Sequence, residues 1–252
     1  MKKRLKDDAI LFRIIQYSDS SLILKAFARQ QGLVSLLAKG IRKKAEGSLL
    51  SPLNSYEFSF YGPGESELCL LTELSLLKEN KLSHKIEAWS AAQCATELYS
   101  QLFLTMEESP AWFVLLVEYL DYLEKTEGRA ILIWWRFLLR VFKMLGTPLE
   151  PGICRLCGKA LTSPAFWERA GASSLCGECL GSAYDTSRYA RLSPMAVRIL
   201  TLLPRIGLYL NELNPDGESV AQLNELFSQH YQAHFHKALN LKSLGVLEQF
   251  YS

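Results

Sequence analysis

Four cysteines in two closely spaced pairs constrain this chain more than any other feature of its 252 residues. Two residues separate Cys154 from Cys157 and Cys176 from Cys179, and eighteen residues lie between the pairs. A short turn lets two sulfurs at this spacing face one ion, and two such turns complete a tetrahedron of thiolates around Zn²⁺. Two disulfides or four unrelated thiols are the alternatives. The pattern predicts a structural zinc site in a ribbon-like segment over 151–189.

The same pattern argues against metal catalysis, because four thiolates leave no coordination position open for water. The chain contains no G-x-x-x-x-G-K-[ST] phosphate loop and no G-x-S-x-G nucleophile elbow. It also lacks the H-x-E sequence and the proline directly before a cysteine pair that a zinc deaminase requires. We therefore expect a protein that is not an enzyme. An enzyme of another class is the alternative.

Composition indicates a folded protein, with 49% hydrophobic residues, five Trp, twelve Phe and eleven Tyr. No apolar run approaches the ~18–20 residues that span a bilayer. The basic N-terminus is followed by two aspartates and not by a secretory apolar segment. We expect a cytoplasmic protein without a membrane partner, in a compartment where thiols stay reduced and can hold metal.

Charge is distributed unevenly along the chain, although the net charge is only +2. Residues 1–44 contain eleven Lys and Arg against three Asp and Glu, which is a balance of +8. The other 208 residues contain seventeen against twenty-three, which is a balance of −6. Such asymmetry is typical of a module that binds nucleic acid or another polyanion.

The first 80 residues are predicted to form five short strands. The expected strands cover 9–17, 22–29, 33–39, 56–61 and 67–77. The Gln-Gln-Gly connection at 30–32 favours a hairpin, and the aromatic residues of 56–61 alternate with a period of two. Five strands without an intervening helix predict a small closed barrel or sandwich over 1–80.

Beyond residue 80 the apolar spacing changes to three and four, which predicts amphipathic helices. The expected helices cover 82–106, 109–125, 128–145, 193–203, 219–238 and 239–250. Ser109-Pro110 and Ser193-Pro194 are favourable helix starts. Because helices lie on both sides of the cysteine segment, we predict one α-helical domain, formed by 81–150 and 190–252, with 151–189 as an insertion.

A basic loop at 39–44 is the second candidate site. A basic loop at a strand end can follow a phosphate backbone, and the sheet face of a five-stranded barrel commonly holds single strands. A solvated turn that keeps the protein soluble is the alternative. The predicted DNA-binding patch consists of Lys2, Lys3, Arg4, Lys6, Lys25, Arg29, Lys39, Arg42, Lys43 and Lys44.

The helix expected at 128–145 carries a cationic row. Arg136, Arg140 and Lys143 are spaced so that they share one helix face, and Trp134 and other aromatic residues flank that face. A cationic row beside an aromatic cleft suits the acidic tail of a protein partner. These four residues are the predicted partner site. The alternative is the solvated stripe of a core helix.

Other candidates are weaker. His230 and His234 are four residues apart on a predicted helix, with His236 close by, but no third ligand is evident. We therefore expect ordinary surface or partly buried histidines. Cys69 and Cys94 lie in apolar runs and are expected to be core thiols.

Several short motifs follow one another in a characteristic order along the chain. They are the runs 14–24 and 32–42, Leu-Gly-Thr-Pro at 145–148, the cysteine segment, Leu-Ser-Pro at 192–194 and Leu-Lys-Ser-Leu at 241–244. Together they resemble the RecO family of DNA repair and recombination mediator proteins. The resemblance spans nearly the whole chain, and its specificity lies in the order of the motifs and in the four cysteines.

The resemblance implies an α+β multidomain protein with an N-terminal OB-fold barrel and a C-terminal helical domain into which a zinc segment is inserted. It implies binding of single- and double-stranded DNA, strand annealing, and partnership with RecR in loading recombinase. It also implies contact with the acidic C-terminal tail of single-stranded DNA-binding protein, a structural Zn²⁺, a location at the bacterial nucleoid and no small-molecule substrate. The alternative is a zinc-ribbon adaptor without DNA activity of its own.

Overall fold

The computed structural model describes residues 3–62, 68–170, 173–182 and 185–252. The chain forms two compact units, Met1–Lys125 and Thr126–Ser252, which we call the N-terminal and C-terminal units. The division falls inside the segment 81–150 that was expected to belong to a single helical domain. The predicted domain bounds stay a prediction.

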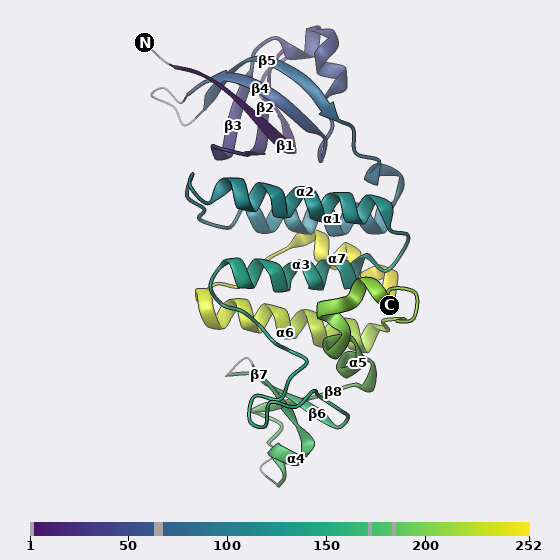
Figure 1. The fold of residues 1–252 in the computed structure, drawn as a ribbon. Coiled ribbons are helices and arrows are strands. Elements are labelled where there is room, and N and C mark those ends of the chain that lie inside the picture. Colours follow the sequence, from purple (N-terminus) through teal and green to yellow (C-terminus); the bar gives the residue numbers. More distant parts are fainter. Residues whose placement is uncertain (1–2, 63–67, 171–172, 183–184) are drawn as a thin grey trace. The chain divides into compact units, whose positions relative to one another are not determined.

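Five strands of the N-terminal unit close into a barrel with the order β1-β2-β3-β5-β4 (Figure 1). The neighbours are antiparallel except β3 and β5, which run parallel. This is the five-stranded barrel of an OB-fold, as the sequence predicted. The strands are β1 (Arg4–Gln16), β2 (Leu22–Ala28), β3 (Gly32–Ala38), β4 (Ser55–Tyr61) and β5 (Cys69–Lys78).

Strand β1 begins five residues before the expected start at residue 9. Its first half pairs with β4, in register from Arg4 opposite Tyr61, and its second half pairs with β2. The charged residues at the start of β1 include Arg4 and Lys6, which are exposed, and Asp7, which is buried and accepts from the backbone N–H groups of Gln30 and Gln31. They interrupt the apolar run by which strands were recognised. Their ladder depends on β4, a partner about fifty residues away in the chain.

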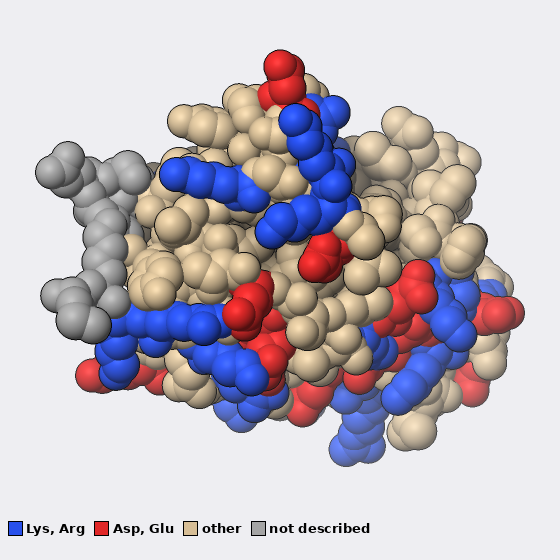
Figure 2. Space-filling view, turned by 90° about the horizontal axis from the view of Figure 1, so that it is seen from above, with Lys and Arg blue, Asp and Glu red and all other residues tan. Residues whose placement is uncertain are grey.

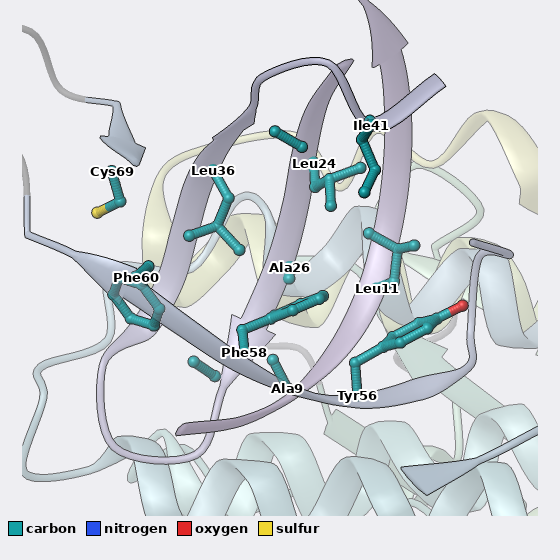
Figure 3. Close-up of a cluster of buried hydrophobic side chains, with 12 residues drawn as sticks. Ala9, Leu11, Leu24, Ala26, Leu36, Ile41, Tyr56, Phe58, Phe60 and Cys69 are labelled. Carbon is teal, nitrogen blue, oxygen red and sulfur yellow. The ribbon is translucent and has the colours of Figure 1, made fainter. Parts of the chain in front are cut away.

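Side chains alternate between the two faces of the barrel wall. Lys and Arg gather in several groups on the outer surface, with Asp and Glu beside some of them (Figure 2). The inward side chains form the core, in which the rings of Tyr56 and Phe58 stack with centroids 5.4 Å apart and Leu11, Leu24 and Leu36 are fully buried (Figure 3). This core fixes which residues of each strand face solvent.

Two helices, α1 (Ile86–Tyr99) and α2 (Ser109–Lys125), pack on the barrel after the short 3-10 helix η3 (Leu82–His84). Tyr99 joins the layers, because its ring lies 5.1 Å from that of Phe27 and 5.6 Å from that of Trp112. Helix α1 ends at Tyr99, and the predicted end at residue 106 is wrong. Thr105 and Glu108 exchange side-chain to backbone hydrogen bonds of 2.9 and 3.3 Å, a capping box that starts a new helix.

The C-terminal unit contains the remaining helices. They are α3 (Ala130–Met144), α4 (Gly177–Leu180), α5 (Pro194–Leu202), α6 (Gly217–Phe235) and α7 (Lys242–Glu248), with the 3-10 helices η4 (Leu203–Leu208) and η5 (Gln249–Tyr251). Helices α3 and α6 share a buried core, where Trp135 donates to the Asn224 side chain at 2.7 Å and the Phe142 and Phe227 rings are 6.2 Å apart. No helix in the described ranges is long and apolar enough to cross a membrane.

The cysteine segment forms a three-stranded antiparallel sheet with the order β7-β6-β8. Its strands are β6 (Ala165–Glu168), β7 (Ser173–Cys176) and β8 (Tyr189–Leu192). The indole nitrogen of Trp167 on β6 donates to the side-chain oxygen of Gln229 on α6 at 2.7 Å. The ribbon-like segment that the sequence predicted is thus held against a helix of the same unit.

Candidate metal centre and nucleic-acid interface

The four cysteines meet at the edge of the ribbon sheet. Cys154 and Cys157 lie in the turns before β6, Cys176 ends β7, and Cys179 lies in α4. Their Sγ atoms lie within 4.8 Å of one another, with Cys157 and Cys176 at 3.9 Å, and all are free thiols. Tetrahedral Zn–S bonds of ~2.3 Å place sulfurs about 3.8 Å apart. The donor set and its spacing therefore fit a metal ion, and the four cysteines form no disulfide in this structure.

Backbone N–H groups favour the thiolate form of one of these cysteines, Cys154. Burial raises the pKa of the Cys154 thiol, but N–H groups of Cys176, Cys157 and Leu156 outweigh it and bring the pKa down to about 6. Hydrogen bonds with the sulfurs of Cys176 and Cys157 raise the pKa of Cys179 to about 12. Four thiolates in so small a volume repel one another, so a cation is needed to hold all of them deprotonated.

A buried carboxylate ties the first cysteine turn to the sheet. Glu168 on β6 is 3% exposed and binds Arg188 at 2.6 Å and Arg155 at 3.1 Å. The hydrogen bond from Arg188 is the main reason that the pKa of Glu168 lies below its usual range. Because Arg155 lies between two of the cysteines, this ion network helps to hold the turn in place.

The basic loop at 39–44 is fixed to the barrel by its one apolar residue. Gly40 has a φ of 68°, and the short helices η1 (Ile41–Lys43) and η2 (Ala45–Leu49) follow it. Ile41 inserts into the barrel core and is 6% exposed (Figure 3). The backbone and guanidinium groups of Arg42 donate to the carbonyls of Ser20 and Ser18 at 3.1 and 3.2 Å.

The end of η2, which follows this loop, is held from inside the barrel. The Tyr56 hydroxyl donates to the Leu49 carbonyl at 2.7 Å and accepts from the Ser51 N–H at 2.8 Å. The side chains of Lys39, Lys43 and Lys44 are exposed. The loop therefore presents cations to solvent from a backbone that is already ordered.

The outer face of β1, β2 and β3 continues from this loop. Arg13 lies opposite Lys25 across β1 and β2, and both are exposed. Two residues further along β1, and on the same face, Ile15 lies opposite Ile23, which in turn lies opposite Leu37 on β3. These three aliphatic side chains are half-buried and outside the barrel core. We call this set, flanked by Arg13 and Lys25 on one side and Lys39 on the other, the β1–β3 face.

Two residues of this surface were missing from the predicted patch. Arg13 is one, and Tyr17, which is 60% exposed in the turn between β1 and β2, is the other. Arg13, Ile15 and Tyr17 are spaced by two, so the strand alternation was the signal that could have found them. An exposed aromatic ring beside cations is the side chain on which single-stranded bases stack.

Other predicted cations lie elsewhere on the barrel and are paired with carboxylates. The pairs are Arg4–Glu73 at 2.5 Å, Lys6–Glu57 at 2.9 Å and Arg29–Asp8 at 3.8 Å. Lys3 is exposed, and Lys2 lies outside the described residues. Apart from Lys3, the described members of the predicted patch therefore fall into two sets. Lys25 and the cations of the basic loop belong to the β1–β3 face and its loop, whereas Arg4, Lys6 and Arg29 are paired elsewhere on the barrel.

The cationic row on α3 is partly accessible. Arg140 and Lys143 are exposed, Arg136 is half-buried, and Trp134 is fully buried. An aromatic contact with a partner through Trp134 would require its neighbours to move. The assignment of this row to an acidic tail stays a prediction.

The remaining candidates have structural surroundings. His230 is 2% exposed, its Nε2 lies 2.9 Å from the Thr147 carbonyl, and burial lowers its pKa. Its ring lies 4.5 Å from that of His234, yet in the described part of the chain only the four cysteines form a group of three or more metal-binding side chains. Cys69 and Cys94 are buried, as core thiols should be.

Comparisons with known proteins cover both units. A family model described as "Recombination protein O N terminal" matches residues 1–80, and one described as "Recombination protein O C terminal" matches residues 83–244. The barrel and the helical region with its cysteine group are therefore each similar to part of the same protein family.

Curated relatives agree with the family models, and each of the three that follow is named "DNA repair protein RecO". The relative from Halalkalibacterium halodurans is 23% identical over 250 positions, covering 98% of this chain and 95% of the relative. That from Chlorobium phaeobacteroides is 26% identical over 269 positions, with 98% and 99% covered. That from Salinibacter ruber is 27% identical over 161 positions, with 63% and 61% covered.

The fold and the site define an OB-fold protein with an appended helical unit and a four-cysteine candidate metal centre. The chain belongs to the RecO family of DNA repair proteins.

Proposed function

We propose that this protein is a recombination mediator that binds single- and double-stranded DNA and anneals complementary strands. With RecR, it helps to load recombinase onto DNA coated by single-stranded DNA-binding protein. The observation that carries the proposal is the β1–β3 face, where Arg13, Lys25 and Lys39 surround a row of aliphatic side chains beside the basic loop.

In this scheme cations bind phosphates and the apolar row supports the bases. Lys39, Lys43 and Lys44 contact the backbone of one strand, while Ile15 and Ile23 lie under its bases. A strand held on one open face keeps its base-pairing edges accessible, so a complementary strand can pair with it. The pre-ordered loop lowers the entropy cost of binding. No covalent bond is made or broken, so the protein acts without being an enzyme.

The C-terminal unit serves structure and partners. Cys154, Cys157, Cys176 and Cys179 hold a structural Zn²⁺, which supplies a cation that keeps all four sulfurs as thiolates. The exposed cations of α3 (Arg140 and Lys143) receive the acidic tail of single-stranded DNA-binding protein, with Trp134 and Arg136 behind them. A zinc-ribbon adaptor without DNA activity is the competing function.

A strand-annealing assay on DNA coated by its binding protein tests the proposal. Annealing should be faster with the protein than without it, and DNA affinity should fall steeply with salt because counterions are released. Charge reversal by Lys43→Glu with Lys44→Glu should strongly weaken both DNA binding and annealing, and by more than neutralising the same two lysines would. Retained DNA binding in that variant favours the adaptor, and a flat salt dependence contradicts the electrostatic mechanism.

A further inference from the structure

A cavity of about 250 Å³ lies in the barrel wall between the basic loop and β5. The parallel pairing of β3 with β5 ends at Leu37 opposite Leu70, although β5 continues to Lys78. From Leu71 onward, β4 is the one strand in the described ranges that pairs with β5. A strand with one neighbour leaves alternate backbone N–H and C=O groups unpaired. This wall therefore offers hydrogen-bond donors and acceptors to a ligand.

The wall is shaped by a β-bulge. Glu73 pairs with Ser59 and Leu71 with Phe60, so Thr72 is the extra residue, and its hydroxyl donates to the Ser59 carbonyl at 2.9 Å. Bulges of this kind re-aim side chains next to binding sites. The break in the β3–β5 ladder and the bulge in the β4–β5 ladder thus occur at the same cavity.

The lining of the cavity combines two kinds of groups. Ile41 and Leu71 contribute apolar surface, whereas Lys39 and Lys44 of the basic loop and Glu46 of η2 contribute charges. Glu46 is exposed and makes no ion pair within the described part of the chain, while the other lining carboxylate, Glu73, is already paired with Arg4. A ligand that fits this lining is flat, partly apolar, flanked by negative charge and able to donate to a carboxylate.

We infer that the cavity takes one base of single-stranded DNA, and that it prefers bases with an exocyclic amino group over thymine. The inference rests on the proposed function, because Lys39 lies both on the β1–β3 face and at the cavity. Lys39 and Lys44 bind the phosphates on either side of the base, and the Glu46 carboxylate accepts from the amino group, as carboxylates do from cytosine N4. Thymine instead presents carbonyl oxygens beside its single N–H, and these repel a carboxylate.

The volume supports one base and not a longer ligand. Pockets for drug-sized molecules occupy roughly 300–1,000 Å³, so about 250 Å³ suits a smaller planar group. An extended peptide added to the free edge of β5 is the competing occupant. The cationic side chains of the loop, continuous with the β1–β3 face, favour DNA.

Fluorescence anisotropy of the full-length protein with labelled dC and dT oligomers of about 16 nucleotides tests the inference. The dC oligomer should bind about three- to tenfold more tightly than the dT oligomer, which is the net effect of one typical hydrogen bond exposed to solvent. Glu46→Gln should bring the affinity ratio close to one. Glu57→Gln, which removes a carboxylate paired with Lys6 elsewhere on the barrel, should change both affinities equally and keep the ratio.

Each result has one meaning. Equal, salt-dependent binding of both oligomers by the parent protein, or a dC preference that survives Glu46→Gln, overturns the base pocket and leaves the proposed function standing. Failure of both oligomers to bind overturns the proposed function and the pocket together. If the parent ratio is one and an alternating Glu-Val peptide binds until Thr72→Pro removes a backbone donor, the edge of β5 belongs to a peptide.

Discussion

The β1–β3 face and the cysteine centre place charge in opposite ways. The β1–β3 face and the adjoining loop spread cations such as Lys25, Lys39 and Lys44 over an exposed surface, where water screens each of them. The cysteine centre brings four sulfurs within 4.8 Å of one another, and two of its cysteines, Cys154 and Cys176, are buried. The first arrangement can gain or lose a charge at little cost to the fold. A metal ion bound at the second would have to compensate all four of its ligands at once.

This difference predicts how mutations in the two regions should affect DNA affinity and protein stability. Contacts with phosphates contribute separately, so the loss of one cation weakens binding by a fraction. Metal ligands act together, because a site with three thiolates has lost both a bond and its closed geometry. Mutations in the β1–β3 face should therefore lower DNA affinity in small steps. Mutation of a single cysteine of the centre should instead cause one large loss of stability.

Removal of a metal ligand should have the largest effect. Cys176→Ser should lower metal content and cost the C-terminal unit several kcal/mol, a share of the ~10–16 kcal/mol that a four-ligand zinc site contributes. DNA affinity per folded molecule should change by less than about twofold, because the cations proposed to bind DNA belong to the barrel. Thermal unfolding, metal analysis by mass spectrometry and DNA titration measure the three quantities.

Cys69→Ser is the matched control, since it alters a buried thiol of the barrel core and should leave metal content unchanged. Full metal content and an unchanged unfolding temperature in Cys176→Ser would show that the cysteines are not a cooperative site. A large loss of DNA affinity in folded Cys176→Ser would show instead that the two regions are coupled.

Neutralising exposed cations should have a smaller and graded effect. Lys43→Gln with Lys44→Gln should weaken single-stranded DNA binding about tenfold, or ~1.4 kcal/mol. The slope of affinity against salt should fall by about 1.4, the value for two lost phosphate contacts. Salt titrations of DNA binding measure both numbers.

Arg4→Gln with Lys6→Gln removes the same number of charges from the paired part of the barrel. These cations are already compensated by Glu73 and Glu57, so their loss should weaken binding less than about threefold. An equal effect of both double variants would remove the distinction between the β1–β3 face and the paired cations.

Local patterns were sufficient for much of this architecture. Helix α2 begins at Ser109 and ends at Lys125, as its serine-proline start and apolar spacing predicted. The cysteine spacing predicted the cluster, because the turns that converge the sulfurs are themselves local. The alternation of 56–61 likewise corresponds to β4.

What the sequence did not reveal depends on distant partners or on competing signals. The start of β1 at Arg4 relies on pairing with β4, and its ion pairs involve Glu57 and Glu73. Helix α1 stops at Tyr99, and Thr105 and Glu108 cap the next helix, but continuing apolar spacing hid this break. Which cations are paired with carboxylates, such as Arg4 with Glu73 and Lys6 with Glu57, became clear only from the closed barrel, because the partners lie on strands distant in sequence.

The smallest expected effect is a change of stability with pH. It concerns the helical core of the C-terminal unit, and not the β1–β3 face or the cysteine centre. His230 faces Phe142, the Thr147 carbonyl and His234, and burial lowers its pKa below the usual 6.5. Between that value and the lower folded-state pKa, the unfolded chain binds a proton that the folded chain does not. The free energy of unfolding should therefore fall as the pH drops below about 6.5, by at most ~1.4 kcal/mol per pH unit.

Hydrogen exchange of α6 at pH 7 and pH 5.5 measures this loss, after correction for the intrinsic pH dependence of exchange. His230→Gln should reduce the pH dependence, because the amide does not titrate, whereas His234→Gln on the exposed side should largely retain it. The variants must be compared with the parent protein at each pH, since protons also compete with metal for thiolates. If His230→Gln and the parent protein show the same pH dependence, His230 is not its source. The acid sensitivity of the C-terminal unit would then be assigned to the cysteine centre.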